Sequence, residues 1–233
     1  MKRNLLCGVL ALLLLSGLSG EASANSEGWD QGFYLSVGAG YMQVNNDSHV
    51  ITGSQFSKNW EPALANLTIG WDATMWVRPL LSMTYTTATS SVGNAGAAVG
   101  AFPAGTFPTE NAREHVLDIT LANRFTLPYF VEKGNDATVK FLPYLKVGGT
   151  AHALFVNAST DANKVGAFGG GPAVGIGAQI NVWKGLFFNI DATEHLIFQK
   201  AYKTTVAGTP DTKVTDGGFK PRFAVLGSIG WHF

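Results

Sequence analysis

The sequence ends with GFKPRFAVLGSIGWHF, residues 218–233, and this stretch decides the fold. Large apolar side chains recur at alternate positions over most of it, with polar or small residues between them. A period of two places one kind of side chain on each face of a β-strand. One face carries Phe219, Phe223, Val225, Ile229, Trp231 and Phe233, and the other carries Lys220, Arg222, Ser228 and His232.

Seven further segments show the same alternation. They are predicted strands of about 10 to 15 residues or more, longer than the five or six residues of an average globular strand. Tight turns at 72–75 and 183–186 contrast with long polar or Gly/Ala-rich loops at 45–62, 89–112 and 204–218. The predicted strands cover residues 31–44, 63–72, 75–88, 113–127, 138–157 and 165–183, with a seventh that begins at Leu186.

The first 24 residues have the features of a secretory signal peptide. Lys2 and Arg3 give a positive start, residues 5–15 are almost entirely apolar, and Ala22-Ser23-Ala24 offers small residues for cleavage. We therefore expect residues 1–24 to be removed and residues 25–233 to form one domain. Cys7, the only cysteine, lies in the signal peptide, so the mature chain has no thiol for a disulfide or a zinc site.

The composition of the mature chain restricts its partners and its class. Removal of residues 1–24 leaves 14 basic and 15 acidic residues with no basic run, which argues against a nucleic-acid partner. Only 14% of the whole chain is charged and 12% is aromatic, which suits strands that face lipid. The mature chain lacks an apolar run of about 20 residues, the length that a membrane-spanning helix needs.

Three features favour a membrane barrel over a soluble β-sandwich, which alternation alone does not exclude. They are the long strands, the alternation of short turns with long loops, and a chain that stops on an aromatic residue. Aromatic residues also lie near the predicted strand ends, where a bilayer interface would be. The fold expected is all-β, an eight-stranded antiparallel transmembrane β-barrel with short periplasmic turns and long extracellular loops. The aromatic residues near strand ends are Phe33, Trp71, Trp76, Phe125, Tyr129, Trp183 and Trp231.

Residues 227–233 resemble the C-terminal signal that the barrel-assembly machinery reads. Ile229, Trp231 and Phe233 supply its alternating apolar residues and terminal aromatic, while Ser228 stands where the signal usually has glycine. As a whole, the mature chain resembles the small OmpA-like and OmpW-like outer-membrane barrels, and its long last loop is most similar to the OmpW group. The resemblance implies a bacterial outer-membrane location, with outer-membrane lipid or lipopolysaccharide and the assembly machinery as partners.

Charged residues on the polar strand faces predict a charge network inside the barrel. An eight-stranded barrel has room for side chains or one small ligand. Asp118 and Lys146 lie on neighbouring strands and could meet. Two interpretations stay open: ion pairs that plug the lumen, because isolated buried charges are costly, or a narrow polar conduit. The predicted network comprises Arg78, Glu114, Asp118, Arg124, Lys146, Asp191 and Arg222.

A second set of residues marks a candidate path for a solute. Gly169, Gly171, Gly175 and Gly177 put no side chain into the lumen. Large residues such as Tyr34, Tyr144 and Met42 fill the space, or a cavity remains. OmpW-like barrels are thought to pass small apolar molecules through a side opening, and that resemblance gives Pro172 a role. Loop 89–112 would either present three apolar side chains to a hydrophobic solute or be a mobile surface loop; these side chains are Val99, Phe102 and Phe107.

Four residues disturb the strand pattern. Pro79, Pro143 and Pro172 cannot donate to a ladder, so each implies a bulge, a strand end or a missing bond. Glu194 falls in phase with the apolar residues of its strand and would point to lipid. Either a bulge near 193–195 turns it inward, or it lies above the apolar band.

The histidines give little support to catalysis. Outer-membrane lipid A deacylases resemble this architecture but carry a His-x-Ser pair, which is absent here. Asp191 and His195 are four apart and should share a strand face. A metal site from His152 and His195 has no further support, so we expect no cofactor and no metal.

Two functions of different classes fit the sequence. The first is a narrow outer-membrane channel or carrier for small or hydrophobic solutes. The alternative is a structural or surface-interaction barrel with a plugged lumen, which binds host factors or other surfaces through its loops.

Overall fold

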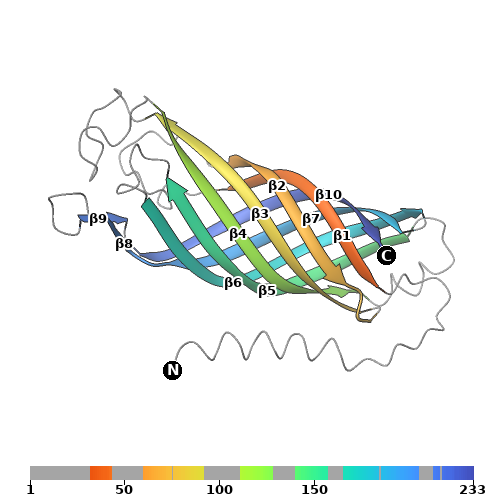
Figure 1. Cartoon of the computed structure of the whole chain (residues 1–233). Coiled ribbons are helices and arrows are strands. Elements are labelled where there is room, and N and C mark those ends of the chain that lie inside the picture. The colour runs from red at the N-terminus through yellow and green to blue at the C-terminus, as the bar shows by residue number, and fades with distance from the viewer. Residues whose placement is uncertain are drawn as a thin grey trace.

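A computed structural model describes residues 32–43, 60–74, 76–91, 111–127, 140–156, 165–183, 185–204, 212–215 and 217–233. Within these ranges the chain is built from strands (Figure 1). Residues 1–24, including the predicted signal peptide, lie outside the described residues, as do most of the predicted long loops. The strands are β1 Phe33–Gln43, β2 Trp60–Trp71, β3 Val77–Ser91, β4 Asn111–Thr126, β5 Lys140–Val156, β6 Val165–Trp183, β7 Leu186–Gln199, β8 Tyr202–Thr204, β9 Thr212–Thr215 and β10 Gly218–His232.

Eight of the strands close into a barrel, in the order β1-β10-β7-β6-β5-β4-β3-β2. Every neighbouring pair is antiparallel, and the first and last strands pair continuously from Tyr34 with His232 to Met42 with Ala224. Beyond this ladder the Phe233 amide donates to the Phe33 carbonyl at 2.8 Å. The prediction of an eight-stranded antiparallel barrel is therefore confirmed.

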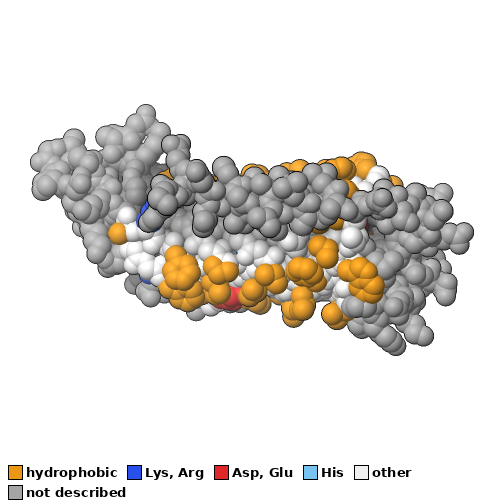
Figure 2. All heavy atoms as spheres, turned by 90° about the horizontal axis from the view of Figure 1, so that it is seen from below, with side chains coloured by type: hydrophobic (Ala, Val, Ile, Leu, Met, Phe, Trp, Pro, Cys, Tyr) orange, Lys and Arg blue, Asp and Glu red, His pale blue; other side chains and the backbone are white. Residues whose placement is uncertain are grey.

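The two faces of each barrel strand differ as the alternation predicts. Large apolar side chains such as Val37, Ile69 and Ile176 are exposed on the outer wall, and the side chains between them are buried inside. Figure 2 shows hydrophobic side chains gathered on one side of this wall. An apolar outside and a polar inside suit a barrel in lipid, where closure also removes unpaired sheet edges. Among the described residues, no helix is long and apolar enough to span a bilayer.

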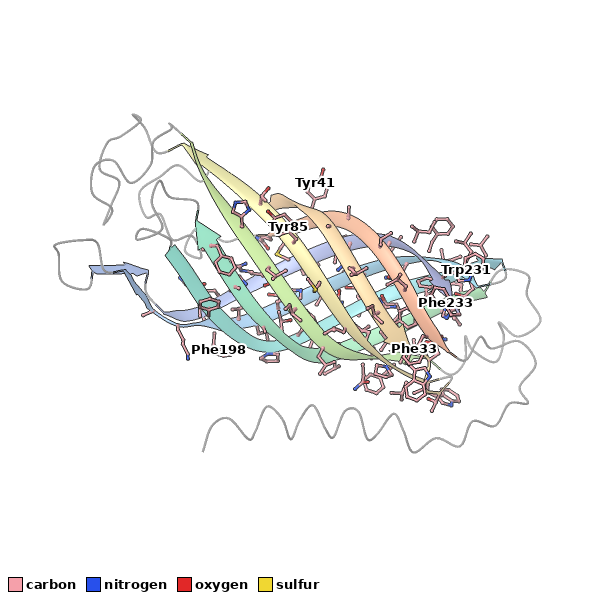
Figure 3. All side chains as sticks on the ribbon, in the orientation of Figure 1. Phe33, Tyr41, Tyr85, Phe198, Trp231 and Phe233 are labelled. Atoms are coloured by element: carbon pink, nitrogen blue, oxygen red, sulfur yellow. The ribbon has the colours of Figure 1, made fainter. Side chains whose placement is uncertain are left out.

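Aromatic side chains pack against one another at both ends of the barrel wall. Phe33 stacks on Trp71 at one end, with ring centroids 5.8 Å apart, and Phe198 packs on Phe219 at the other end, at 5.3 Å. In Figure 3, Phe33 and Trp231 lie at the end where the chain terminates, while Phe198 lies towards the opposite end. Such girdles are typical of barrels that cross a membrane.

Two short strands at the last predicted loop, 204–218, were not expected from the sequence. β8 ends where this loop begins, β9 lies inside it, and the two form a two-stranded sheet in which Tyr202 pairs with Thr215. The sheet follows the pairing of Gln199 with Gly218, so it continues the β7–β10 hairpin beyond the barrel after a short break. Threonine, common in both strands, favours an extended backbone. β2, β3 and β4 likewise extend a few residues into the predicted loops.

Glu194 contradicts both interpretations offered for it. The β7–β10 ladder is continuous through Glu194, so no bulge turns the residue inward. Its neighbours across the ladders are Phe223 and Val174, and the apolar face continues beyond it with Leu196 and Phe198. The half-buried carboxylate therefore lies within the apolar band of the outer wall.

The prolines occupy positions where a missing N–H is tolerated. Pro79, third in β3, pairs with Asn123 on β4 and lies just beyond the last β2 pair, at Leu80. Pro143 is the fourth residue of β5, and its carbonyl accepts from the Leu127 amide at 3.2 Å. The third proline, Pro172, interrupts a ladder and is described with the lumen.

Replacement of Glu194 by leucine should stabilise the protein, because it removes a carboxylate from the lipid-facing wall. We expect the free energy of unfolding to rise by about 1 kcal/mol, since acidic residues on this face cost less than the 2–4 kcal/mol of a mid-plane arginine. Equilibrium denaturation in phospholipid measures the change. The matched control is Ile176→Glu, which should lower stability. A Glu194→Leu variant less stable than the wild type would contradict this placement.

Candidate functional site in the barrel lumen

Inward-facing side chains fill the lumen in successive layers. The turn end is the end where β2 runs into β3 and β6 into β7, and the loop end is the opposite one. Because the inward positions alternate along each strand, every strand contributes one side chain to the lumen at each second residue. Six of the seven predicted network residues are described there, each at most 7% exposed: Arg78, Asp118, Arg124, Lys146, Asp191 and Arg222. Glu114 belongs to β4, but its side chain is outside the described residues.

The layer at the turn end is centred on Asp72. Its Oδ1 lies 3.3 Å from Arg78 Nε, and its Oδ2 lies 3.2 Å from His232 Nδ1. Phe187 packs on His232, with ring centroids 4.7 Å apart, and meets Tyr34 edge to face at 5.7 Å. The sequence analysis placed Asp72 in a turn and missed this role. Its phase with Thr68 and Gly70 of β2 would have indicated an inward position.

The next layer is an ion-paired cluster on β5 and β7. Lys146 pairs with Asp191, which also accepts hydrogen bonds from Thr193 and, at 2.9 Å, from the Tyr144 hydroxyl. Arg124 lies over the Tyr144 ring, 4.6 Å from its centroid. These contacts leave the carboxylate of Asp191 surrounded by donors, which is what a buried charge requires.

A third polar layer lies nearer the loop end. His152 Nδ1 is 2.6 Å from Asp118 Oδ1, and Arg222 Nη1 lies 3.5 Å from the same ring nitrogen. His195 Nδ1 bonds to Thr150 Oγ1 at 2.8 Å. Asp191 and His195 share the inner face of β7, as predicted, but each bonds to different partners.

The expected contact between Asp118 and Lys146 is not formed. Asp118 lies directly across the β4–β5 ladder from His152, whereas Lys146 lies across from Arg124. Two strands that are neighbours therefore place these two charges at different heights in the lumen. Lys146 instead meets Asp191, a residue of β7 that the sequence analysis did not pair with it.

A group of apolar side chains lies next towards the loop end, with the buried polar Thr86 across from Val116 and Gln199 two positions beyond Ile197. Three of its members lie two positions from a polar residue of the third layer, on the side of the loop end: Val116 beside Asp118, Leu154 beside His152, and Ile197 beside His195. The fourth, Ala167, pairs with Leu154 across the β5–β6 ladder. Each of these four side chains faces inward and is at most 1% exposed. We call Val116, Leu154, Ala167 and Ile197 the apolar mouth. Sequence reasoning missed it because the register that brings these residues together was unknown.

The glycines of β6 are closely packed rather than open to a cavity. A side chain at Gly177 would overlap the Tyr144 ring, so this tyrosine fills the space there, one of the alternatives that the sequence left open. A side chain at Gly169, Gly171 or Gly175 would overlap the backbone of β7. The glycines thus allow close approach of neighbouring groups.

The ladder between β6 and β7 is interrupted near its loop end. Gly170 pairs with Phe198 and Ala173 with His195, but Gly171 and Pro172, both within the described part of β6, are not paired with β7. Pro172 has no N–H to donate. Gly171 still packs against the Leu196 carbonyl, so the two strands remain in contact. Of the other predicted path residues, Val99, Phe102 and Phe107 lie outside the described residues.

No metal centre is apparent in the part of the chain that the structure describes. There, no group of three or more His, Cys, Asp or Glu side chains could hold an ion.

Comparison with known proteins gives the class of the chain. Residues 10–223 match the family described as outer membrane protein beta-barrel domain, so the chain belongs to this family and is an outer-membrane protein. No curated protein matches the sequence significantly.

Solved structures similar to the chain are small outer-membrane barrels. The outer membrane protein OprG from Pseudomonas aeruginosa is 15% identical, with 90% of this chain and 100% of that chain covered and a TM-score of 0.56. Neisserial surface protein A is 11% identical, with 87% and 97% covered and a TM-score of 0.50. Because the sequence identities are this low, these similarities show that the fold is shared and nothing more.

Replacement of Lys146 by methionine should destabilise the barrel strongly. The change leaves the buried Asp191 carboxylate without its ammonium partner, which typically costs about 3–5 kcal/mol. Equilibrium denaturation in phospholipid measures the loss, with Leu145→Met on the outer wall as a control of similar size. The double variant Lys146→Met/Asp191→Leu should recover most of the loss. A single variant as stable as the double variant would contradict the pairing.

Proposed function

We propose that this barrel takes up small hydrophobic molecules at its loop end and releases them sideways into the membrane. The observation that carries the proposal is the apolar mouth, which lies directly above the charged layer of Asp118, His152 and Arg222. Apolar side chains inside a polar barrel lumen offer a hydrophobic solute a site that excludes water.

The charged layers argue against a straight path through the barrel. Below the mouth, buried ion pairs and hydrogen-bonded groups occupy the lumen at each level, from Arg222 down to Asp72. A hydrophobic solute gains nothing from displacing groups that satisfy one another, and an unpaired charge left behind would be costly. This arrangement favours an exit above the layers.

The interruption at Gly171 and Pro172 supplies the position of that exit. It lies on β6 and β7, the strands that also contribute Ala167 and Ile197 to the mouth. Fewer ladder bonds hold the strands together here than along the rest of β6 and β7, so local separation of these two strands costs least at this point. The apolar side chains of loop 89–112, Val99, Phe102 and Phe107, would bind a solute first and release it to the apolar mouth.

The remaining partners follow from the wall and the last strand. Lipid or lipopolysaccharide would cover the outer face, and the assembly machinery would recognise Ile229, Trp231 and Phe233, whose side chains are all exposed. The proposal includes no catalysis, because Thr150 with His195 and Asp118 with His152 form two separate pairs.

A disulfide across the interruption tests the lateral exit. Because the native mature sequence contains no cysteine, the double variant Pro172→Cys/Leu196→Cys should form a single bridge between β6 and β7. The measured quantity is the protein-dependent uptake of an apolar fluorescent solute by liposomes that contain the barrel. The oxidised variant should lose most of this uptake, and reduction of the disulfide should restore it.

The control is a bridge at Leu117→Cys/Ala153→Cys, which pair across β4 and β5 away from the interruption. This variant should take up solute normally in both redox states. Uptake by the oxidised Pro172→Cys/Leu196→Cys variant at the wild-type rate would refute the lateral exit.

A structural or surface-interaction barrel is the second candidate, and the filled lumen favours it. A barrel stabilised internally by ion pairs needs no solute to be useful, because its loops can bind surfaces or host factors. If so, binding should move with loops 45–62, 89–112 and 204–218 when they are grafted onto another small barrel, as a pull-down would show. Binding that persists after these loops are replaced would exclude it.

A further inference from the structure

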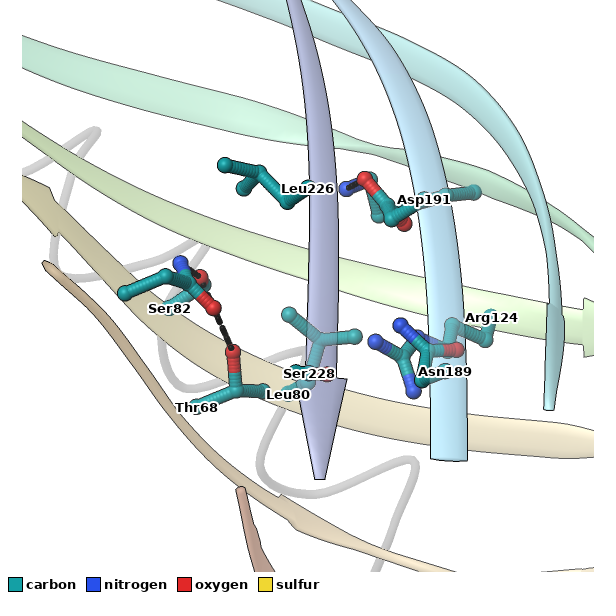
Figure 4. A pocket seen from close by; sticks show the side chains of 10 residues that line it. Thr68, Leu80, Ser82, Arg124, Asn189, Asp191, Leu226 and Ser228 are labelled. Atoms are coloured by element: carbon teal, nitrogen blue, oxygen red, sulfur yellow. Dashed lines mark hydrogen bonds and ion pairs between the residues drawn. The ribbon is translucent and has the colours of Figure 1, made fainter. Parts of the chain in front are cut away.

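A small polar cavity of ≈ 10 Å³ lies inside the barrel, between the turn-end layer and the third polar layer. Figure 4 shows Thr68 and Ser82 on one side of it and Arg124, Asn189 and Asp191 on the other. Lys146 also lines it. The free space at its centre suits about one water-sized particle.

The cavity has more positive than negative charge in its wall. Arg124 and Lys146 contribute two cations, while Asp191 is the single carboxylate that lines it. Asp191 Oδ1 accepts from Lys146 and Thr193, and Oδ2 lies 2.9 Å from the Tyr144 hydroxyl. Asp191 is therefore a single carboxylate that faces two cations, Lys146 and Arg124.

Arg124 differs from the other described cations of the lumen. Arg78 is paired with Asp72, Lys146 with Asp191, and Arg222 lies beside the Asp118–His152 pair. Arg124 is 4% exposed, and its Nε and Nη1 have no hydrogen-bond partner among the described residues.

Aromatic rings give Arg124 only partial compensation. Its guanidinium lies 4.6 Å from the centroid of Tyr144 and 5.8 Å from that of Tyr34. A cation–π contact offsets part of the cost of removing a guanidinium from water, but it leaves the N–H groups unsatisfied.

The neutral groups of the wall also present hydrogens rather than acceptors. Ser82 Oγ accepts from Asn66 Nδ2 at 2.8 Å and from Thr68 Oγ1 at 3.0 Å, which leaves its own hydrogen to donate. The Tyr144 hydroxyl lies 2.8 Å from Asn189 Oδ1 and shares its one hydrogen between this oxygen and Asp191, so the Asn189 NH₂ group remains as a donor. A water molecule needs acceptors as well as donors, whereas an anion needs donors alone.

We propose that this cavity binds a small monovalent anion, of which chloride is the simplest case. The anion would lie beside Arg124 and accept hydrogen bonds from Ser82 and Asn189. It would neutralise the excess charge and hold β3, β4 and β7 together from the inside. This proposal does not depend on the proposed transport function.

Thermal unfolding of the purified full-length barrel in detergent micelles tests the site. Unfolding is compared in sodium chloride, sodium bromide and sodium gluconate at equal ionic strength, because gluconate is too large to enter. The midpoint should rise with chloride or bromide and then saturate, as for a ligand that binds only the folded state. In gluconate it should not rise.

Two variants separate binding from general stability. Arg124→Gln should remove the difference between chloride and gluconate. Arg78→Gln, which loses the ion pair to Asp72 outside the cavity, should lower the midpoint in all salts but keep the difference. An Arg124→Gln variant that retains the chloride dependence would overturn the proposal.

A direct observation covers the case in which Arg124→Gln fails to fold. Wild-type crystals grown in bromide should show an anomalous scattering peak in the cavity beside Arg124. Wild-type protein that unfolds at the same temperature in chloride and gluconate, together with crystals that lack this peak, would show that the cavity holds water only.

Discussion

The closed backbone ladder is the constraint from which the rest of the structure follows. In hydrocarbon an unpaired N–H or C=O has no water to bond to, so the first strand must meet the last. β1 and β10 pair from Tyr34 with His232 to Met42 with Ala224, and no strand in the barrel is left with a free edge. Closure then gives every strand an inner and an outer face, and the period of two distributes the side chains between lipid and lumen.

The lumen of so narrow a barrel has to satisfy its own polar groups. Asp72, Asp118 and Asp191 each lie beside a cation or a histidine, and the partners of Asp118 and Asp191 come from other strands, 34 and 45 residues away in the sequence. Arg124 is the exception, because aromatic rings and a donor-rich cavity surround it. Glu194 is the corresponding exception on the outer wall. A buried or lipid-facing charge without a partner of opposite charge is costly. Arg124 and Glu194 are therefore the two positions where a charged side chain lowers the stability of the folded barrel.

Strand phase could be read from the sequence, but strand register could not. The terminal strand, the faces of β5 and the inward position of Arg222 follow from alternation alone, since each depends only on the neighbouring residues in the chain. The partner of Asp118 depends on how β4 slides along β5, and the apolar mouth depends on the register of four strands. For the same reason a contact between Lys146 and Asp118 was left possible, although Lys146 pairs with Asp191. The sequence also could not locate β8 and β9, whose pairing extends the hairpin of β7 and β10.

We propose that the polar layers seal the lumen beneath the apolar mouth, so that the barrel does not conduct ions along its axis. Ionic current through the purified protein in a planar lipid bilayer tests this proposal. Because buried ion pairs occupy the path from Arg222 to Asp72, we expect no current at any salt concentration, even where apolar solute uptake is measurable in liposomes. Stable current steps that scale with salt concentration would contradict it, since they require an open aqueous path past these layers.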